Sequence, residues 1–474
     1  MSAALDLALR EQAAGVASGE LDPAELLDAC LERIEERNPD LNAIVAIFPE
    51  ESRRMLAEAP DGPLRGVPVL IKDEWPLPWR AQTFGAPPEH LNAKAGESGP
   101  YRALRDAGAV IAGVANMHEL GSSSTGNTSF YGAAHNPWDL ERCPGGSSSG
   151  PAAAVAGGIV SGAVGADGLG SIRYPAAYCG LTGLKTTFGR SAMQGHHLAA
   201  NTETIVSGPL CRDAADCRLL GSVLVGEEQH AGDARVRASA TRLMDGLRIG
   251  VIRDPYWSDC APGILAAGEA ALESLRAEVG GKVIEVELPG DRLHIPAALL
   301  VAQSEDAAEL TPQRLNALSP ELGVINRGLI KLRALLPTSL TARAFLVRAQ
   351  ARRDLAELFE RIDLLAWPTV PAPAPPLAEP TIELPSGIST ADAGNARQGV
   401  IANLTGVPGV SVPVGLDAGM PVGLQLLGPW GSDARLLDAA EALERATDRE
   451  FVELRPAAVA SVAGRDQSRP RGRY

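Results

Sequence analysis

One lysine and two serines have the residue types and surroundings needed for covalent catalysis. Lys72 directly follows the apolar run 67–71, while Ser147 and Ser171 lie in glycine-rich stretches. A serine becomes a nucleophile when a base takes its proton, and a lysine amine can be that base where burial disfavours its charged form. A lone lysine at a strand end more commonly reaches back to water with its ammonium group. Serine–lysine catalysis is therefore a hypothesis that needs further residues to support it.

A histidine-based serine hydrolase is the first alternative. Residues 146–150 (GSSSG) match the GxSxG nucleophile elbow, with Ser148 at its centre. That arrangement requires an acid and then a histidine downstream, yet the last histidine of the chain is His294. The match also arises easily by chance in a stretch rich in glycine and serine. The sequence therefore argues against this class.

The sequence contains none of the common motifs for binding a metal ion or a nucleotide. The seven histidines form no HExxH, and the six cysteines form no CxxC. Residues 145–150 lack the Lys-Ser/Thr pair that ends a phosphate-binding loop, and residues 165–170 do not have the dinucleotide-binding spacing. We expect no metal and no other cofactor.

The elements that must position these residues alternate between helices and apolar strands, which is typical of a sheet covered on both faces. Helices are predicted at 24–34, 101–107 and 151–161. Strands are predicted at 67–71, 109–115, 163–166, 248–253, 283–288, 363–367, 410–414 and 423–427. The proline-rich segment 368–385 is interpreted as a surface excursion, because apolar periodic sequence resumes after it.

Charge and composition exclude several classes of partner. The 474 residues carry a formal net charge of −15, which does not attract nucleic acid or an anionic membrane. No apolar stretch is long enough to span a bilayer, and no signal pattern opens the chain. The six scattered cysteines are expected to be reduced thiols of the core. These features together predict a cytoplasmic protein.

Several blocks of sequence together resemble the amidase signature family, over roughly residues 20 to 448. They are residues 66–73 (GVPVLIKD), 136–139 (NPWD), 144–150 (PGGSSSG), 165–175 (GADGLGSIRYP), 179–186 (CGLTGLKT) and 421–428 (PVGLQLLG). The resemblance implies one α/β/α domain with a large twisted mixed β-sheet between helices. Within it we expect an N-terminal helical segment at 1–60, the amidase signature domain at 61–460 and a disordered tail at 461–474.

The resemblance also implies roles for individual residues. Ser171 would be the nucleophile, Ser147 a bridging serine preceded by a cis peptide bond, and Lys72 the base. Asp167 and Arg173 would brace the loop. Backbone N–H groups would form the oxyanion hole, contributed by Gly168, Leu169, Gly170 and Ser171. By resemblance alone, the protein is expected to be a homodimer.

The chain departs from the family pattern beside the nucleophile. Ala166 replaces the usual threonine, and Leu169 replaces a glycine, which would strain the backbone if that position requires a positive φ. Leu169 would also narrow the acyl side of the substrate pocket. Further pocket candidates are Tyr131, His196 and His197.

These observations favour an amidohydrolase acting on a small-molecule amide. An amide synthase or acyl transferase would use the same acyl-enzyme but release it to an amine. The glutaminase subunit of a tRNA-dependent amidotransferase resembles the chain in length and motifs, and would require a partner protein. A binding protein on the same scaffold is disfavoured, because the chain retains the lysine and both serines.

Overall fold

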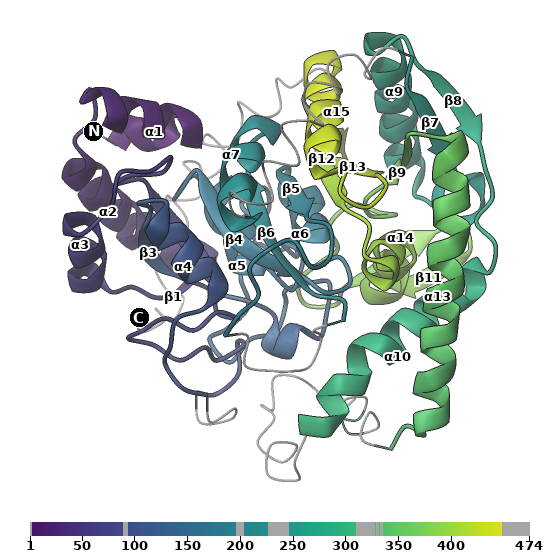
Figure 1. Ribbon diagram of the computed structural model, residues 1–474, viewed down its shortest axis with the longest axis horizontal. Helices are drawn as coiled ribbons and strands as arrows, with labels where there is room; N and C mark the ends of the chain where they lie inside the picture. Colours follow the sequence, from purple (N-terminus) through teal and green to yellow (C-terminus); the bar gives the residue numbers. More distant parts are fainter. Residues whose placement is uncertain are drawn as a thin grey trace.

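The computed structural model describes residues 2–88, 93–195, 203–225, 246–309, 328, 331 and 335–447. Within these residues, eleven strands form one mixed sheet, and two more strands form a separate ribbon (Figure 1). Helices pack on both faces of the sheet, which confirms the predicted α/β/α class. The expected tail at 461–474 lies outside the described residues.

The strands of the large sheet come from every part of the described chain. In spatial order they are β1 (Ile44–Ala46), β3 (Val110–Ala115), β2 (Pro68–Lys72), β4 (Gly162–Asp167), β6 (Val206–Cys211), β5 (Thr182–Lys185), β12 (Gly409–Asp417), β13 (Met420–Leu427), β9 (Leu364–Pro368), β7 (Arg248–Val251) and β8 (Lys282–Glu285). The ribbon pairs β10 (Thr381–Leu384) with β11 (Gly387–Thr390).

The helices connect these strands and cover them. The α-helices are α1 (Leu9–Ser18), α2 (Pro23–Leu41), α3 (Pro49–Ala57), α4 (Gly99–Asp106), α5 (Ser149–Ala156), α6 (Arg173–Cys179), α7 (Ala214–Val225), α9 (Pro262–Glu278), α10 (Asp291–Glu309), α13 (Thr338–Arg361), α14 (Ala391–Thr405) and α15 (Asp433–Ala446). Short turns of other helix types are η1 (Ser2–Asp6), η2 (Glu119–Gly121) and η3 (Arg253–Trp257). Of the helices in the described ranges, none combines the length and the apolar character needed to cross a membrane.

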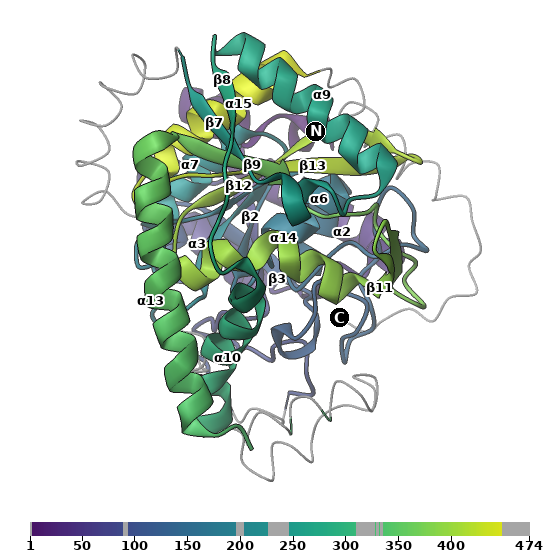
Figure 2. The same cartoon turned by 90° about the vertical axis from the view of Figure 1, so that its right-hand side faces the viewer.

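Alternation along the strands separates two apolar layers. In β2, Val69 and Ile71 belong to a cluster that includes residues of α4, α7 and α15, whereas Leu70 belongs to one that includes α2 and α5. Successive side chains of a strand point to opposite faces, so Lys72 shares the face of Leu70. In Figure 2, helix α14 runs across the view below strands β9 and β13.

Three parallel strands end at the same edge of the sheet. Ile71 of β2 is in register with Val114 of β3 and with Val164 of β4. Residues that follow these strands are therefore brought together, as expected at the carboxyl edge of a parallel sheet. Lys72 ends β2 and Asp167 ends β4, so both lie at this edge.

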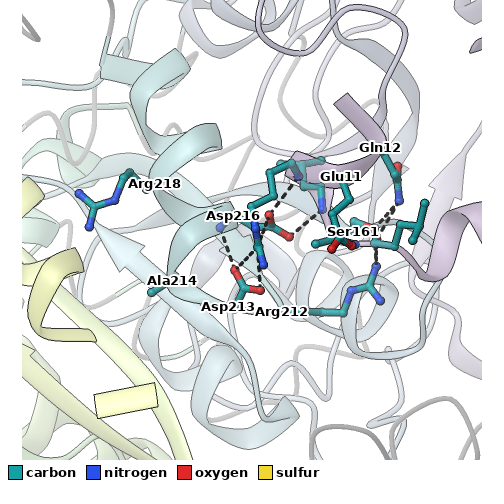
Figure 3. A network of polar contacts seen from close by, with 12 residues as sticks. Glu11, Gln12, Ser161, Arg212, Asp213, Ala214, Asp216 and Arg218 are labelled. Atoms are coloured by element: carbon teal, nitrogen blue, oxygen red, sulfur yellow. Dashed lines mark hydrogen bonds and ion pairs between the residues drawn. The ribbon is translucent and has the colours of Figure 1, made fainter. Parts of the chain in front are cut away.

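The N-terminal segment is fastened to the sheet by polar contacts (Figure 3). The carboxylate of Asp216 at α7 accepts the backbone N–H groups of Leu9 at 2.7 Å and of Arg10 at 3.1 Å, which satisfies two donors at the start of α1. The side chain of Gln12 donates to the hydroxyl of Ser161 at 2.6 Å, and both residues are fully buried. The segment 1–60 also supplies β1, which pairs with β3.

The interpretation of residues 368–385 as a surface excursion is wrong for its first half. Val370, Ala372 and Ala374 are buried, and only the part that leads into β10 and β11 reaches the surface. Proline has no backbone N–H that must be satisfied, so a proline-rich chain can be buried with few partners. Its carbonyls are used: Pro371 accepts the N–H of Ala261 at 2.7 Å.

None of the six cysteines forms a disulfide, and all of them are buried, as the sequence predicts. They are Cys30, Cys143, Cys179, Cys211, Cys217 and Cys260. Burial raises the pKa of the Cys30, Cys143 and Cys260 thiols to about 12. These side chains therefore behave as small apolar groups of the core.

Candidate active site

Lys72 lies at the end of β2 and is 1% exposed. Its Nζ is 2.9 Å from the Oγ of Ser147, a residue that precedes α5. Helix α5 belongs to the apolar layer on the face of the sheet that Lys72 shares. The lysine and the bridging serine expected from the sequence are therefore in hydrogen-bond contact, away from water.

The turn before Ser147 requires glycine for steric reasons. The peptide bond between Gly146 and Ser147 is cis. A Cβ at Gly145 would lie 2.5 Å from the Cα of Pro175, and one at Gly146 would lie 2.7 Å from the N of Gly126. Any larger side chain would displace backbone atoms, so the two glycines allow Ser147 to approach Lys72.

Ser171 lies in the loop between β4 and α6. Its carbonyl accepts the N–H of Ser148 at 3.2 Å, which joins this loop to the one carrying Ser147. Ser171 is partly exposed whereas Ser147 is buried, so the residue expected to attack the substrate is the more accessible of the two. The structure thus places Lys72 in contact with Ser147 and joins the loop of Ser147 to that of Ser171.

The Asp167 carboxylate, paired with Arg173, braces the loop on both sides of Ser171. The Asp167 carboxylate accepts the N–H of Gly170 at 2.6 Å and that of Ile172 at 3.3 Å, the two residues that flank Ser171. Burial by itself would raise the pKa of Asp167, but the guanidinium of Arg173 outweighs it and lowers this pKa to about 2. This carboxylate is therefore ionised at neutral pH.

The same contact changes the expectation for the oxyanion hole. Because the N–H of Gly170 donates to Asp167, it is already engaged. Within the described chain, no protein acceptor is found for the N–H groups of Gly168, Leu169 and Ser171. Leu169 does not have a positive φ, so the expected strain at this position does not arise, whereas Gly170 has a φ of 120°. Three of the four expected donors remain for an oxyanion.

Ser148 has a structural role. Its hydroxyl donates to the carbonyl of Ala166 at 3.2 Å and accepts that residue's N–H at 3.3 Å. The centre of the GxSxG match is therefore bound to β4, which agrees with the argument against a histidine-based hydrolase.

Two buried polar residues beside Lys72 were missed by the sequence reasoning. The Oε2 of Glu74 lies 2.6 Å from Nζ of Lys72. The imidazole of His118 is 1% exposed, and its backbone N–H donates to the carbonyl of Ser147 at 3.1 Å. Burial, together with the charge of Lys72, lowers the pKa of His118 to about 4 despite the opposing effect of Asp392. This histidine is therefore neutral at physiological pH.

The loop after Lys72 is organised around Asp73. Its carboxylate accepts the N–H of Thr83 at 3.0 Å and that of Gly85 at 3.3 Å, and it pairs with Arg80. The pocket candidate Tyr131 contacts this loop, with its hydroxyl 3.1 Å from the Oγ1 of Thr83. The pocket candidates His196 and His197 lie outside the described residues.

A family model and curated relatives both match most of this chain. The family model described as Amidase matches residues 25–437. The chain is 33% identical over 482 residues to one of the subunits of the glutamyl-tRNA(Gln) amidotransferase of Chromohalobacter salexigens, covering 94% of this chain and 97% of that protein.

Solved structures of amide-cleaving enzymes are also similar to the chain. The 6-aminohexanoate cyclic dimer hydrolase, solved with its substrate, is similar with a TM-score of 0.83 and 27% identity, covering 96% of this chain and 99% of that one. A bacterial aryl acylamidase described as an amidase signature enzyme has a TM-score of 0.83 and 25% identity, covering 97% and 99% of the two chains.

Proposed function

The chain belongs to the amidase signature family, and we propose that it is an amidohydrolase that cleaves a carboxylic amide through an acyl-enzyme on Ser171. The observation that carries the proposal is the contact of 2.9 Å between Lys72 and Ser147, in a loop that is hydrogen-bonded to Ser171. A lysine buried at a serine hydroxyl has the geometry of a proton relay.

The proposed acylation proceeds in balanced steps. The Oγ of Ser171 attacks the amide carbon while its proton passes to Ser147, whose own proton passes toward Lys72. The N–H groups of Gly168, Leu169 and Ser171 stabilise the oxyanion, and one such donor contributes roughly 3 to 4 kcal/mol to a transition state. The proton then returns through Ser147 to the leaving amine, and the C–N bond breaks.

Water completes the cycle in a hydrolase. It attacks the acyl-enzyme, gives a proton to the relay, and releases the acid and free Ser171. If an amine took the place of water, the same intermediate would yield a new amide, so the identity of the second acceptor separates hydrolase from acyl transferase.

The test uses a panel of aliphatic, aromatic and dipeptide-like amides, with and without hydroxylamine. Mass spectrometry follows both the products and the intact protein, and Ser171→Ala is the control. We expect acid, and hydroxamate when hydroxylamine is present, with both lost in Ser171→Ala. The ratio of acid to hydroxamate measures how well water competes with an amine. Turnover that persists in Ser171→Ala would contradict the proposed nucleophile.

A second candidate function is the amide-hydrolysing subunit of a tRNA-dependent amidotransferase. It is favoured by the similarity to such subunits over 94% of this chain. This function predicts that the isolated chain releases ammonia from glutamine slowly and that a partner protein accelerates the reaction. The homodimer expected from the family resemblance is tested by light scattering of the isolated chain, since a dimer has twice the mass of the chain.

A further inference from the structure

A buried carboxylate contacts the expected base of the relay. The Oε2 of Glu74 lies 2.6 Å from the Nζ of Lys72, and the two side chains are 5% and 1% exposed. The same Nζ is 2.9 Å from the Oγ of Ser147. Lys72 is therefore held between a serine on one side and a carboxylate on the other.

This contact conflicts with a role for Lys72 as a solitary base. A carboxylate and an amine this close form an ion pair, in which a proton can lie on either of the two groups. An ammonium cannot accept a proton from Ser147 unless it releases another at the same time. The nearby carboxylate provides a place for that proton.

We propose that the Lys72–Glu74 pair, rather than Lys72 alone, accepts the proton of Ser171, which extends the relay by one residue. Glu74 acts through Lys72 and touches neither substrate nor nucleophile. The inference rests on the proposed function, because it concerns the same relay, and it is specific to the glutamate that this chain has after Lys72-Asp73.

In the extended relay, every proton that leaves one group binds the next. The O–H bond of Ser171 breaks as its Oγ bonds to the acyl carbon, and the proton binds Ser147. The proton of Ser147 moves to Lys72, and a proton of Lys72 moves to the Oε2 of Glu74, leaving an ammonium beside a carboxylic acid. When the C–N bond breaks, each proton returns by one position and the last one binds the leaving nitrogen.

The other charged and titratable groups near the relay do not replace Glu74. His118 is neutral above a pH of about 4, because burial lowers its pKa. Asp392, which affects His118 electrostatically, accepts hydrogen bonds from Ser123 and Ser124. Asp73 is engaged by Arg80 and by the loop around it. Among the described carboxylates, Glu74 is the one in contact with Lys72.

The pH dependence of serine reactivity distinguishes a pair from a solitary lysine. The pair is active while it holds one proton and loses activity when it binds a second, which for a carboxylate happens in the acidic range. The ordinary values are about 4.3 for glutamate and about 10.4 for lysine. Removing the carboxylate leaves an amine alone, so the acidic limb of the profile should move to higher pH.

The probe is a fluorophosphonate, which loses fluoride when an activated serine attacks its phosphorus. Its rate of addition to Ser171 is followed by intact mass spectrometry between pH 5 and 10, and requires no amide substrate. The variants are Glu74→Gln, Glu74→Asp as the conservative rescue, and Ser171→Ala as the unlabelled control. Glu444→Gln is the matched control, because Glu444 is a buried glutamate held by Thr182 and Ala214. Thermal unfolding checks that each variant is folded.

We expect the wild type and Glu444→Gln to keep their full labelling rate down to pH 6. In Glu74→Gln the midpoint of the acidic limb should rise to about pH 7 or above, so that labelling at pH 6 falls at least about tenfold below that variant's own alkaline plateau. Glu74→Asp should keep the acidic limb of the wild type with a lower plateau.

Several results would overturn the proposal. One is an acidic limb of the labelling profile that does not move, or moves to lower pH, in Glu74→Gln. Another is a labelling rate that falls by the same factor at every pH in this variant, which would indicate a structural role only. An acidic limb above pH 7 in the wild type would overturn the proposal without any variant. Labelling of Ser171 without turnover of any amide would refute the proposed function and leave the relay measurable, whereas no labelling at all would refute both.

Discussion

Asp167 and Arg173 form an ion pair at 3.0 Å in which neither side chain reaches solvent. The carboxylate holds the loop on both sides of Ser171, and the guanidinium donates to the carbonyl of Gly399 at 3.1 Å. The pair therefore ties the loop that carries Ser171 to helix α14, more than two hundred residues away in the chain.

Replacing Arg173 with methionine should destabilise the protein by about 3–5 kcal/mol, because it leaves the charge of Asp167 buried without compensation. Urea unfolding measures the effect. The matched control is Arg53→Met, because the pair of Arg53 with Asp28 is more than half exposed. That substitution should lower the free energy of unfolding by less than about 1 kcal/mol. Equal stabilities of the two variants would contradict the prediction.

Acid should weaken the fold through Asp167. The pKa of this carboxyl is about 2 in the folded protein and 3.8 ordinarily, because Arg173 outweighs the effect of burial. The stabilisation is therefore complete above pH 4 and is lost as the pH falls toward 2. The difference in unfolding free energy between the wild type and Asp167→Asn should shrink by about 2 kcal/mol between pH 5 and pH 2. A difference independent of pH would refute this role.

Lys185 should also make the stability rise with pH, but in the neutral and alkaline range. Its Nζ donates to the carbonyls of Thr186 and Val407, both at 2.9 Å, and burial lowers its pKa from 10.5 to about 7. Between these values the unfolded chain binds a proton that the folded protein has released, so stability rises with pH by up to about 1.4 kcal/mol per unit.

Lys185→Met should remove this rise between pH 7 and 9, whereas Lys282→Met, at an exposed position, should retain it. Chemical denaturation at a series of pH values is the measurement. A rise that persists unchanged in Lys185→Met would assign it to other groups.

Asp216→Ala should loosen the N-terminal segment. It removes the acceptor for the N–H groups of Leu9 and Arg10, and an unsatisfied buried donor costs about 1–3 kcal/mol. Limited proteolysis should then cut first within α1, before the core is degraded. Asp28→Ala, at an exposed ion pair, is the control and should digest like the wild type.

The sequence was informative about the fold where apolar residues run continuously. The predicted strands at 67–71 and 109–115 correspond to β2 and β3 within one residue at each end. By contrast, β5 and β6 were not predicted, because Gly183, Gly208 and Pro209 interrupt their apolar character. These two strands are stabilised by pairing with β4 and β12 rather than by local preference.

The site was predictable to the extent that it is encoded in short motifs. The blocks around Lys72, Ser147 and Ser171 predict these three residues as the relay, and the structure places Lys72 and Ser147 in contact. The contact of Glu74 with Lys72 could not be predicted in this way, because Glu74 lies beyond the end of β2 in a turn, and the motif does not specify where a side chain of that turn points. Only the turn that ends β2 brings the carboxylate back to the amine. The proximity of Asp392 to His118 likewise depends on the packing of distant segments.

The buried cysteines have a practical consequence for following this protein in motion. Because each native thiol is shielded within the core, maleimide dyes should leave the folded chain unmodified. A cysteine introduced at an exposed position such as Glu58 would then be the sole attachment point for a fluorophore. Two such positions, on opposite sides of the sheet, would allow distance changes during turnover to be recorded on a chain that keeps all of its own cysteines.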